Sequence, residues 1–251
     1  MPSLKLVKKY LIDSQFFVSL MGTLFAVFFL LGEGTFLWPT VFLIFITYFS
    51  GYIYTKYQNH KLFYKILIIN FLCGIIAVML IFVHHNEIRL MKWLVIVILG
   101  LFYNSFFLEN FVRKIPLLKI FYVGLVWGLV NAWLFLPEFN IEIFLISFLF
   151  ITALVLPFDI RDMHDDDVVT FPKLIGVQNT KFVAHILCFL ATFLAIHALK
   201  TDYKIAFFLT GAATFTLIYF SEPTNRDSYF SFGVELCSGL PFIFLVLIQS
   251  F

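Results

Sequence analysis

Charged residues are scarce in this chain of 251 residues, and their scarcity decides its class. Asp, Glu, Lys and Arg make up 13% of the residues, whereas hydrophobic residues make up 62%, and the mean hydropathy is +0.98. A soluble domain of this size would need far more charge to cover its surface. The composition therefore excludes a soluble protein and predicts an integral membrane protein.

Other absences exclude further classes. The three cysteines, Cys73, Cys188 and Cys237, lie in apolar segments and lack the spacing of a disulfide framework or a zinc motif. No polar stretch is long enough for a separate soluble domain, so we expect one membrane domain over residues 1–251. The basic start leads into a spanning apolar run without a clear small-residue cleavage site, which predicts a retained first helix rather than a signal peptide.

Apolar runs of membrane-spanning length recur along the chain. A membrane helix needs roughly 20 mostly apolar residues, and these runs are continuously apolar rather than alternating, as they would be in a membrane barrel. The sequence therefore predicts an all-α, polytopic protein with nine transmembrane helices. The predicted spans are residues 14–32, 36–55, 62–83, 91–108, 117–136, 141–158, 181–199, 203–220 and 229–250.

The basic residues are distributed unequally between the two sets of loops. Short cytoplasmic loops carry an excess of Lys and Arg. The N-terminus and the even-numbered loops hold 13 of the 17 basic residues, and the opposite side holds Arg89, Lys92, Lys200 and Lys204. This asymmetry predicts that the N-terminus and the even-numbered loops are cytoplasmic and that the C-terminus is outside.

Five aspartates follow the sixth predicted span, in the segment FDIRDMHDDDVVTFPKLIG, residues 158–176. Asp159, Asp162 and Asp166 fall at i, i+3 and i+7, on one face if the helix continues past the membrane boundary. Like charges this close repel one another unless a cation neutralises them, and carboxylate oxygens suit Mg²⁺ together with phosphate oxygens. The pattern indicates a site for Mg²⁺ and a diphosphate; the alternative is a solvated acidic loop.

The same segment resembles the second aspartate motif of the UbiA superfamily of intramembrane prenyltransferases, D-x-x-D-x-x-x-D followed by a Thr-Leu-Pro-like stretch ending in Gly. The matching residues are Asp159, Asp162, Asp166, Thr170, Pro172 and Gly176. A second segment, FYNSFFLENFVRKIPLLKIFYVGLVWG (residues 102–128), is similar to the family's run from a tyrosine in the fourth helix through a basic loop. Its matching positions are Tyr103, Arg113, Lys114 and Lys119.

The resemblance implies nine helices around a central lipid-accessible cavity, in which an isoprenoid diphosphate lies with its head group at the cytoplasmic loops. It implies Mg²⁺ as cofactor, with Asp159, Asp162 and Asp166 as metal ligands, and transfer of the prenyl group to an aromatic or lipid acceptor. It also implies a bacterial inner membrane and no nucleic-acid partner; the oligomeric state stays open. The expected substrate-binding residues are Lys56, Tyr103, Arg113, Lys114, Arg161, Lys173 and Glu235.

The chain departs from the family at the first aspartate motif, which the family has at the end of the second helix. The corresponding stretch here, TYFSGYIYTKYQNHK (residues 47–61), contains no acid and places Gly51, Tyr54 and Gln58 where aspartates are expected. In one account Lys56, with His60, contacts the diphosphate directly and replaces the missing metal charge. In the other, Lys56 anchors a helix end and the fold has lost its chemistry.

Glu235 is a carboxylate inside the ninth predicted span, where an acid is costly and therefore a functional candidate. It could face the cavity as a replacement acid or proton acceptor, or it could lie at the interface and pair with Arg226. Three functions remain open: a prenyltransferase, a catalytically silent lipid-binding protein of the same fold, and a small transporter. Against the transporter, the sequence shows no internal repeat.

Overall fold

The computed structural model describes residues 15–58, 60–83, 87–103, 115, 117–164 and 168–250. These residues form nine α-helices and no strand, which confirms the predicted all-α class. The helices are α2 (Phe16–Gly32), α3 (Trp38–Tyr57), α4 (Phe63–Val83), α5 (Glu87–Tyr103), α6 (Leu118–Leu129), α7 (Ile141–Arg161), α8 (Phe171–Ala198), α9 (Thr201–Tyr219) and α10 (Glu235–Gln249). The π-helical segment η2 (Val130–Leu134) extends α6, and η3 (Tyr229–Val234) leads into α10.

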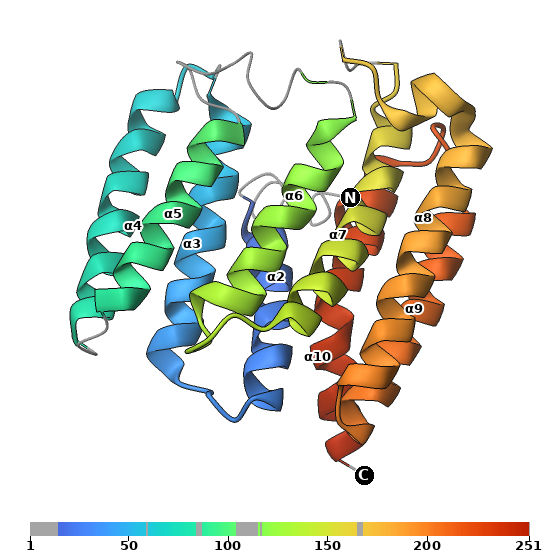
Figure 1. Ribbon diagram of the computed structural model, residues 1–251. Helices are drawn as coiled ribbons and strands as arrows, with labels where there is room; N and C mark the ends of the chain where they lie inside the picture. The colour runs from blue at the N-terminus through green and yellow to red at the C-terminus, as the bar shows by residue number, and fades with distance from the viewer. Residues whose placement is uncertain are drawn as a thin grey trace.

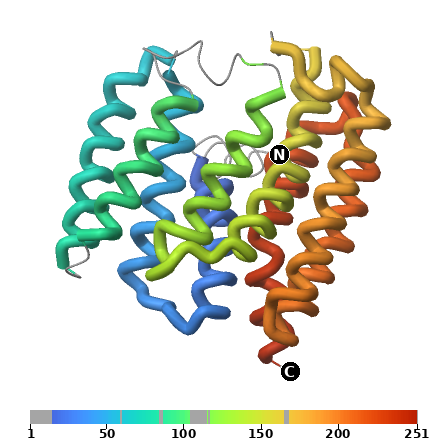
Figure 2. The backbone as a smooth tube through the Cα atoms, viewed as in Figure 1, coloured from blue at the N-terminus to red at the C-terminus, as the bar shows by residue number. Residues whose placement is uncertain are grey.

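The helices run up and down along one bundle axis, and each packs against its neighbours in the chain (Figures 1 and 2). Helix α10 closes the bundle by packing against α2. Because the direction alternates, α3 and α7 end, and α6 begins, at the same end of the bundle, which is the top in Figure 1. The C-terminus lies at the opposite end. The fold thus gathers segments far apart in the sequence at one end.

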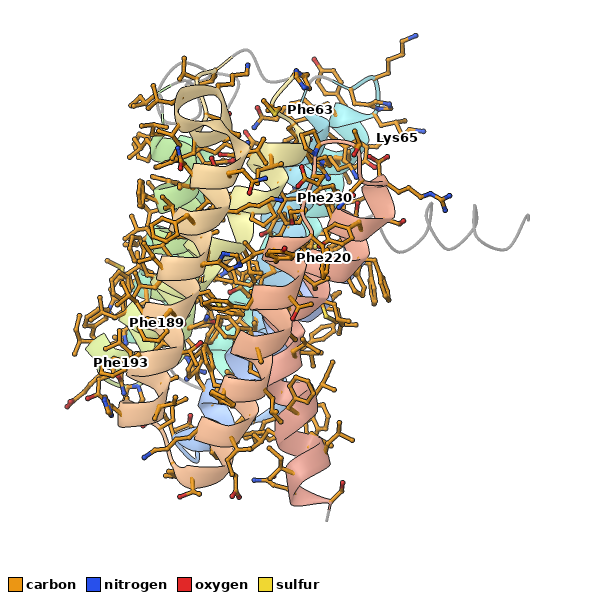
Figure 3. All side chains as sticks on the ribbon, turned by 90° about the vertical axis from the view of Figure 1, so that its right-hand side faces the viewer. Phe63, Lys65, Phe189, Phe193, Phe220 and Phe230 are labelled. Carbon is orange, nitrogen blue, oxygen red and sulfur yellow. The ribbon has the colours of Figure 1, made fainter. Side chains whose placement is uncertain are left out.

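Apolar side chains cover much of the outside of the bundle. Phe189 and Phe193 of α8, for example, lie at its outer surface (Figure 3) and are 59% and 48% exposed. Together with the composition, this surface identifies an integral membrane protein. Within the described residues, the helices long and apolar enough to cross a membrane by length and composition are Phe63–Val83, Ile141–Arg161, Phe171–Ala198 and Tyr229–Gln249, with Phe16–Gly32 and Leu118–Leu134 apolar but shorter.

Helix α8 begins ten residues before the predicted span, which starts at residue 181. Pro172 occupies the first turn, where a proline is tolerated, and Gly176 breaks the helix with φ 80° and ψ 163°. The chain therefore kinks at Gly176, between a short helix before it and the long apolar helix after it. A search for long apolar runs finds the helix after Gly176. It does not find the short helix before Gly176, which has few residues and carries Lys173.

Aromatic side chains fill the half of the bundle nearer the C-terminal end. Phe25, Phe150 and Phe207 come from three helices and have no exposed surface. Their ring centroids lie 5.6 Å apart for Phe25 and Phe150 and 5.2 Å apart for Phe150 and Phe207, distances typical of favourable ring pairs. These three rings therefore form a closely packed aromatic core between α2, α7 and α9.

A buried lysine ties α5 to the end of η2. The Lys92 ammonium donates hydrogen bonds to the backbone carbonyls of Trp133 at 3.0 Å, Leu136 at 2.9 Å and Pro137 at 3.2 Å. The last carbonyls of a helix have no partner within the helix, and in an apolar environment each needs a donor. Lys92 supplies three such bonds from one side chain, so it is a structural residue.

We therefore expect Lys92→Met to destabilise the fold, because methionine keeps the bulk but removes the donor. Hydrogen bonds from a charged group contribute about 1.5–3 kcal/mol each, so the free energy of unfolding should fall by about 2 kcal/mol or more. The measurement is denaturant unfolding of the detergent-purified protein. Lys65→Met, at an exposed position of α4 (Figure 3), is the matched control. Equal stability of the two variants would contradict the assignment.

Candidate functional site

A cavity of about 410 Å³ lies in the half of the bundle where α3 and α7 end. This volume is within the range of roughly 300–1,000 Å³ that is usual for small-molecule sites. The polar residues of its wall are Gln15, Tyr52, Lys56, Tyr103, Lys119, Arg161, Asp162, Ser231, Glu235 and Ser238. The apolar ones are Phe17, Val18, Val123, Trp127, Ile151, Leu154, Val155, Phe158 and Val234.

Helical periodicity explains how the wall is built. On α6, Lys119, Val123 and Trp127 are spaced by four residues and therefore share one face, with the lysine in the first turn. Lys56 lies in the last turn of α3, and Arg161 is the last residue of α7. Because these turns meet at the same end of the bundle, the cavity has a cationic end there. Its deeper part is lined by apolar side chains.

Asp159 is buried beside this cavity rather than in it. Its side chain is 2% exposed, and its Oδ1 accepts a hydrogen bond from the Lys119 ammonium at 3.0 Å. The carboxylate lines a small neighbouring pocket together with Leu117 and Thr170, and Lys119 lines both this pocket and the larger cavity. The ion pair joins α6 to α7 at the cationic end.

Asp162 does line the cavity and is held by its neighbour in the sequence. Both of its oxygens accept hydrogen bonds from Arg161, from Nε at 2.6 Å and from an η nitrogen at 2.8 Å. The Arg161 guanidinium also lies 5.3 Å from the ring centre of Phe158 and 5.8 Å from that of Phe230. Two rings and a carboxylate therefore fix the guanidinium at the cavity wall.

The prediction that one helical face carries Asp159, Asp162 and Asp166 assumed that the helix continues past the membrane boundary, and α7 does not continue. Helix α7 ends at Arg161, and Asp162 is the residue that caps it, with φ −89° and ψ 6°. The two described carboxylates consequently line different pockets. Asp166, like Arg113 and Lys114, lies outside the described residues.

Of the other predicted site residues, most reach the cavity. Lys56, Tyr103, Arg161 and Glu235 all line it. Arg161 is also close enough for its positive charge to act on the Glu235 carboxylate. Lys173 is instead exposed on the first turn of α8 and does not line the cavity.

The missing first motif leaves α3 without a carboxylate at its end. At the positions where acids were expected, the Tyr54 ring packs 5.9 Å from Phe63 and Gln58 is buried at the helix end. Among the residues that the structure describes, no group of three or more Asp, Glu, His or Cys side chains lies close enough to hold a metal ion.

Sequence reasoning missed Trp127 and Tyr52. The indole Nε1 of Trp127 donates a hydrogen bond to the Tyr52 hydroxyl at 3.0 Å, and both side chains line the cavity. Trp127 could have been found because it lies two steps of four residues after Lys119, which is one of the positions matched to the family. In a chain with 36 phenylalanines and 11 tyrosines, one more aromatic residue does not stand out.

Comparison with known proteins identifies the fold. No family model and no curated protein matches the chain. The solved structure of digeranylgeranylglyceryl phosphate synthase is similar, with a TM-score of 0.59, 15% identity and coverage of 98% of both chains. A UbiA homolog from Archaeoglobus fulgidus, bound to GPP and Mg²⁺, is similar with a TM-score of 0.64, 15% identity and coverage of 97% of this chain and 100% of that one. The chain therefore has the UbiA fold.

The two described aspartates should respond differently to substitution. We expect Asp159→Ala to lower the free energy of unfolding by about 2 kcal/mol, less than the 3–5 kcal/mol of fully buried pairs because Lys119 is 23% exposed. Asp162→Ala should cost less, since Asp162 is 31% exposed and its partner is adjacent in the chain. Denaturant unfolding of both variants, with Lys119→Met and the double variant Asp159→Ala/Lys119→Met, measures the coupling. Strictly additive effects at positions 119 and 159 would contradict the ion pair.

Proposed function

We propose that this chain, as one membrane domain, is a prenyltransferase that binds an isoprenoid diphosphate in the cavity and transfers its prenyl group to an aromatic or lipid acceptor. The proposal rests on how charged and apolar residues are distributed along the cavity wall: cationic side chains lie at one end, and apolar side chains line the deeper part. A prenyl diphosphate has the matching form, an anionic head on a hydrocarbon tail. The fold shared with a UbiA homolog bound to GPP and Mg²⁺ supports the same function.

The head group would be bound mainly by side chains rather than by metal. The cavity wall holds three cations, Lys56, Lys119 and Arg161, against two carboxylates, Asp162 and Glu235. Arginine recognises phosphate oxygens through its planar fork, and lysine acts as a compact positive charge. Lys56 stands on the helix that lacks the first aspartate motif, so its ammonium would replace charge that a metal supplies elsewhere. The predicted contacts of Arg113, Lys114 and Lys173 remain part of the proposal.

The described residues fit one Mg²⁺ ion with a diphosphate. Mg²⁺ is usually held by one or two carboxylates, with waters and phosphate oxygens completing its shell. Asp162 lies at the cationic end of the cavity wall, and Asp159 and Asp166 are the further ligands that we propose from the motif. When bound, the ion would neutralise charge on the departing diphosphate. No carboxylate among the described residues of α3 would hold a second ion.

The remaining chemistry would be done by the cavity wall. As the bond between the allylic carbon and the diphosphate oxygen breaks, Lys56, Lys119 and Arg161 stabilise the negative charge that develops on the leaving group. The ring of Phe158, which lies against Arg161 at the cationic end, would face the allylic cation, and the apolar wall would keep water away from it. The acceptor then attacks this carbon, and Glu235 takes the proton that the acceptor loses.

A second candidate is a catalytically silent protein of the same fold that binds a lipid. One observation favours it: both described aspartates of the acidic loop are already neutralised, Asp159 by Lys119 and Asp162 by Arg161. In that case the cavity would hold an amphiphile without a metal and without turnover. The two candidates differ in whether Mg²⁺ contributes to binding.

The test measures binding of geranyl S-thiolodiphosphate, an analogue that resists cleavage, to the detergent-purified protein with Mg²⁺ and with EDTA. We expect Lys56→Met to weaken binding about tenfold or more in both conditions, because a charge-assisted hydrogen bond contributes about 1.5–3 kcal/mol. Asp162→Asn should weaken binding in Mg²⁺ and leave it little changed in EDTA. Lys65→Met, an exposed lysine on α4, should bind as the wild type does.

The outcomes separate the candidates. Weaker binding in EDTA than in Mg²⁺, together with a defect of Asp162→Asn that appears in Mg²⁺ alone, supports the prenyltransferase. Binding that is equal with Mg²⁺ and EDTA, and unchanged in Asp162→Asn, favours the silent lipid-binding protein. No binding under either condition would refute both.

A further inference from the structure

Trp127 is held in a fixed position where the cavity ends. Its side chain is 4% exposed, its indole N–H donates to Tyr52, and its ring centroid lies 4.8 Å from that of Tyr48. On the α2 side the indole packs against Gly22, where a Cβ atom would lie 3.0 Å from the indole Cη2. A glycine at this position makes room for the ring. Contacts from α2 and α3 therefore hold a tryptophan that belongs to α6.

The aromatic core lies directly behind this indole. Trp127 lies 6.4 Å, between ring centroids, from Phe25, the first ring of the aromatic core on α2. Phe150 and Phe207 continue that core, and none of the three has exposed surface. An indole fixed by a hydrogen bond on one side and by packed rings on the other cannot swing aside without displacing them. The cavity thus has a solid floor.

The depth of the cavity above this floor follows from the helix rise. Lys119 and Trp127 are eight residues apart on α6, or about 12 Å at roughly 1.5 Å per residue. Asp162 and Ile151, at the two ends of the α7 wall, are about 16 Å apart by the same measure. An extended isoprene unit adds four carbon–carbon bonds, about 5 Å if a three-bond residue spans at most roughly 3.6 Å. The apolar depth therefore holds two to three units.

We propose that Trp127 is the specificity-determining residue for prenyl chain length, and that it restricts this chain to geranyl and farnesyl diphosphates. This inference rests on the proposed function. The volume of about 410 Å³, near the lower limit for ligand cavities, agrees with a short tail. A geranylgeranyl tail would have to displace the indole or leave the cavity sideways, and it would lose apolar contacts either way.

The experiment compares the affinities of geranyl, farnesyl and geranylgeranyl S-thiolodiphosphate for the full-length protein in detergent with Mg²⁺. The wild type should bind the geranylgeranyl analogue at least about tenfold more weakly than the farnesyl one, the discrimination that a hydrophobic pocket typically gives against excess bulk. Trp127→Ala should remove most of this difference and Trp127→Leu should remove part of it. Two sizes are used because truncating a buried indole also lowers stability.

Trp93→Phe is the matched control, because Trp93 of α5 donates to Thr47 at 3.0 Å and does not line the cavity. It should keep the wild-type ratio of affinities. Equal affinity of the wild type for all three chain lengths, or the same ratio in folded Trp127→Leu as in the wild type, would overturn the inference and leave the proposed function standing. Failure of the wild type to bind any of the three analogues would overturn both.

Discussion

The ion pair between Lys119 and Asp159 is the constraint on which the site depends. In an apolar bundle a buried carboxylate is tolerated when a cation lies against it, and this pair connects the first turn of α6 to the last turn of α7. Once the lysine is fixed there, helical periodicity turns Val123 and Trp127 toward the same cavity. Lys119 at the cationic end and Trp127 at the apolar floor lie on the same face of α6. The contact that orients Lys119 therefore also orients Trp127.

The charges at the cationic end are arranged for an anion as much as for a metal. Arg161 is oriented by Asp162 and by two aromatic rings, and Lys56 stands on the helix that offers no carboxylate. Preoriented cations lower the cost of binding a phosphate because little side-chain freedom is lost. In the proposed site, the Lys56 ammonium on the helix without the first aspartate motif would make binding of the diphosphate less dependent on divalent ions.

Much of the fold was predictable from the sequence, because hydropathy dictates where membrane helices run. The nine helices of the described residues, and the end of the bundle at which α7 ends, follow from apolar runs and their alternation. Lys56, Tyr103, Arg161 and Glu235 do line the cavity. The start of α8 and the separation of Asp159 from Asp162 were not predictable, since they depend on a backbone break at Gly176 and on where α7 stops. Trp127 was missed because its importance comes from Gly22 and Tyr52, contacts that only the tertiary structure creates.

We propose that one cavity holds both the anionic head and the tail of a short prenyl diphosphate. An experimental structure of the protein with geranyl S-thiolodiphosphate and Mg²⁺ would locate both parts of the ligand. We expect the diphosphate between Lys56 and Arg161, the tail along Val123 and Phe158, and its end against Trp127. A ligand bound outside the bundle, or a diphosphate at the opposite end of the helices, would contradict it.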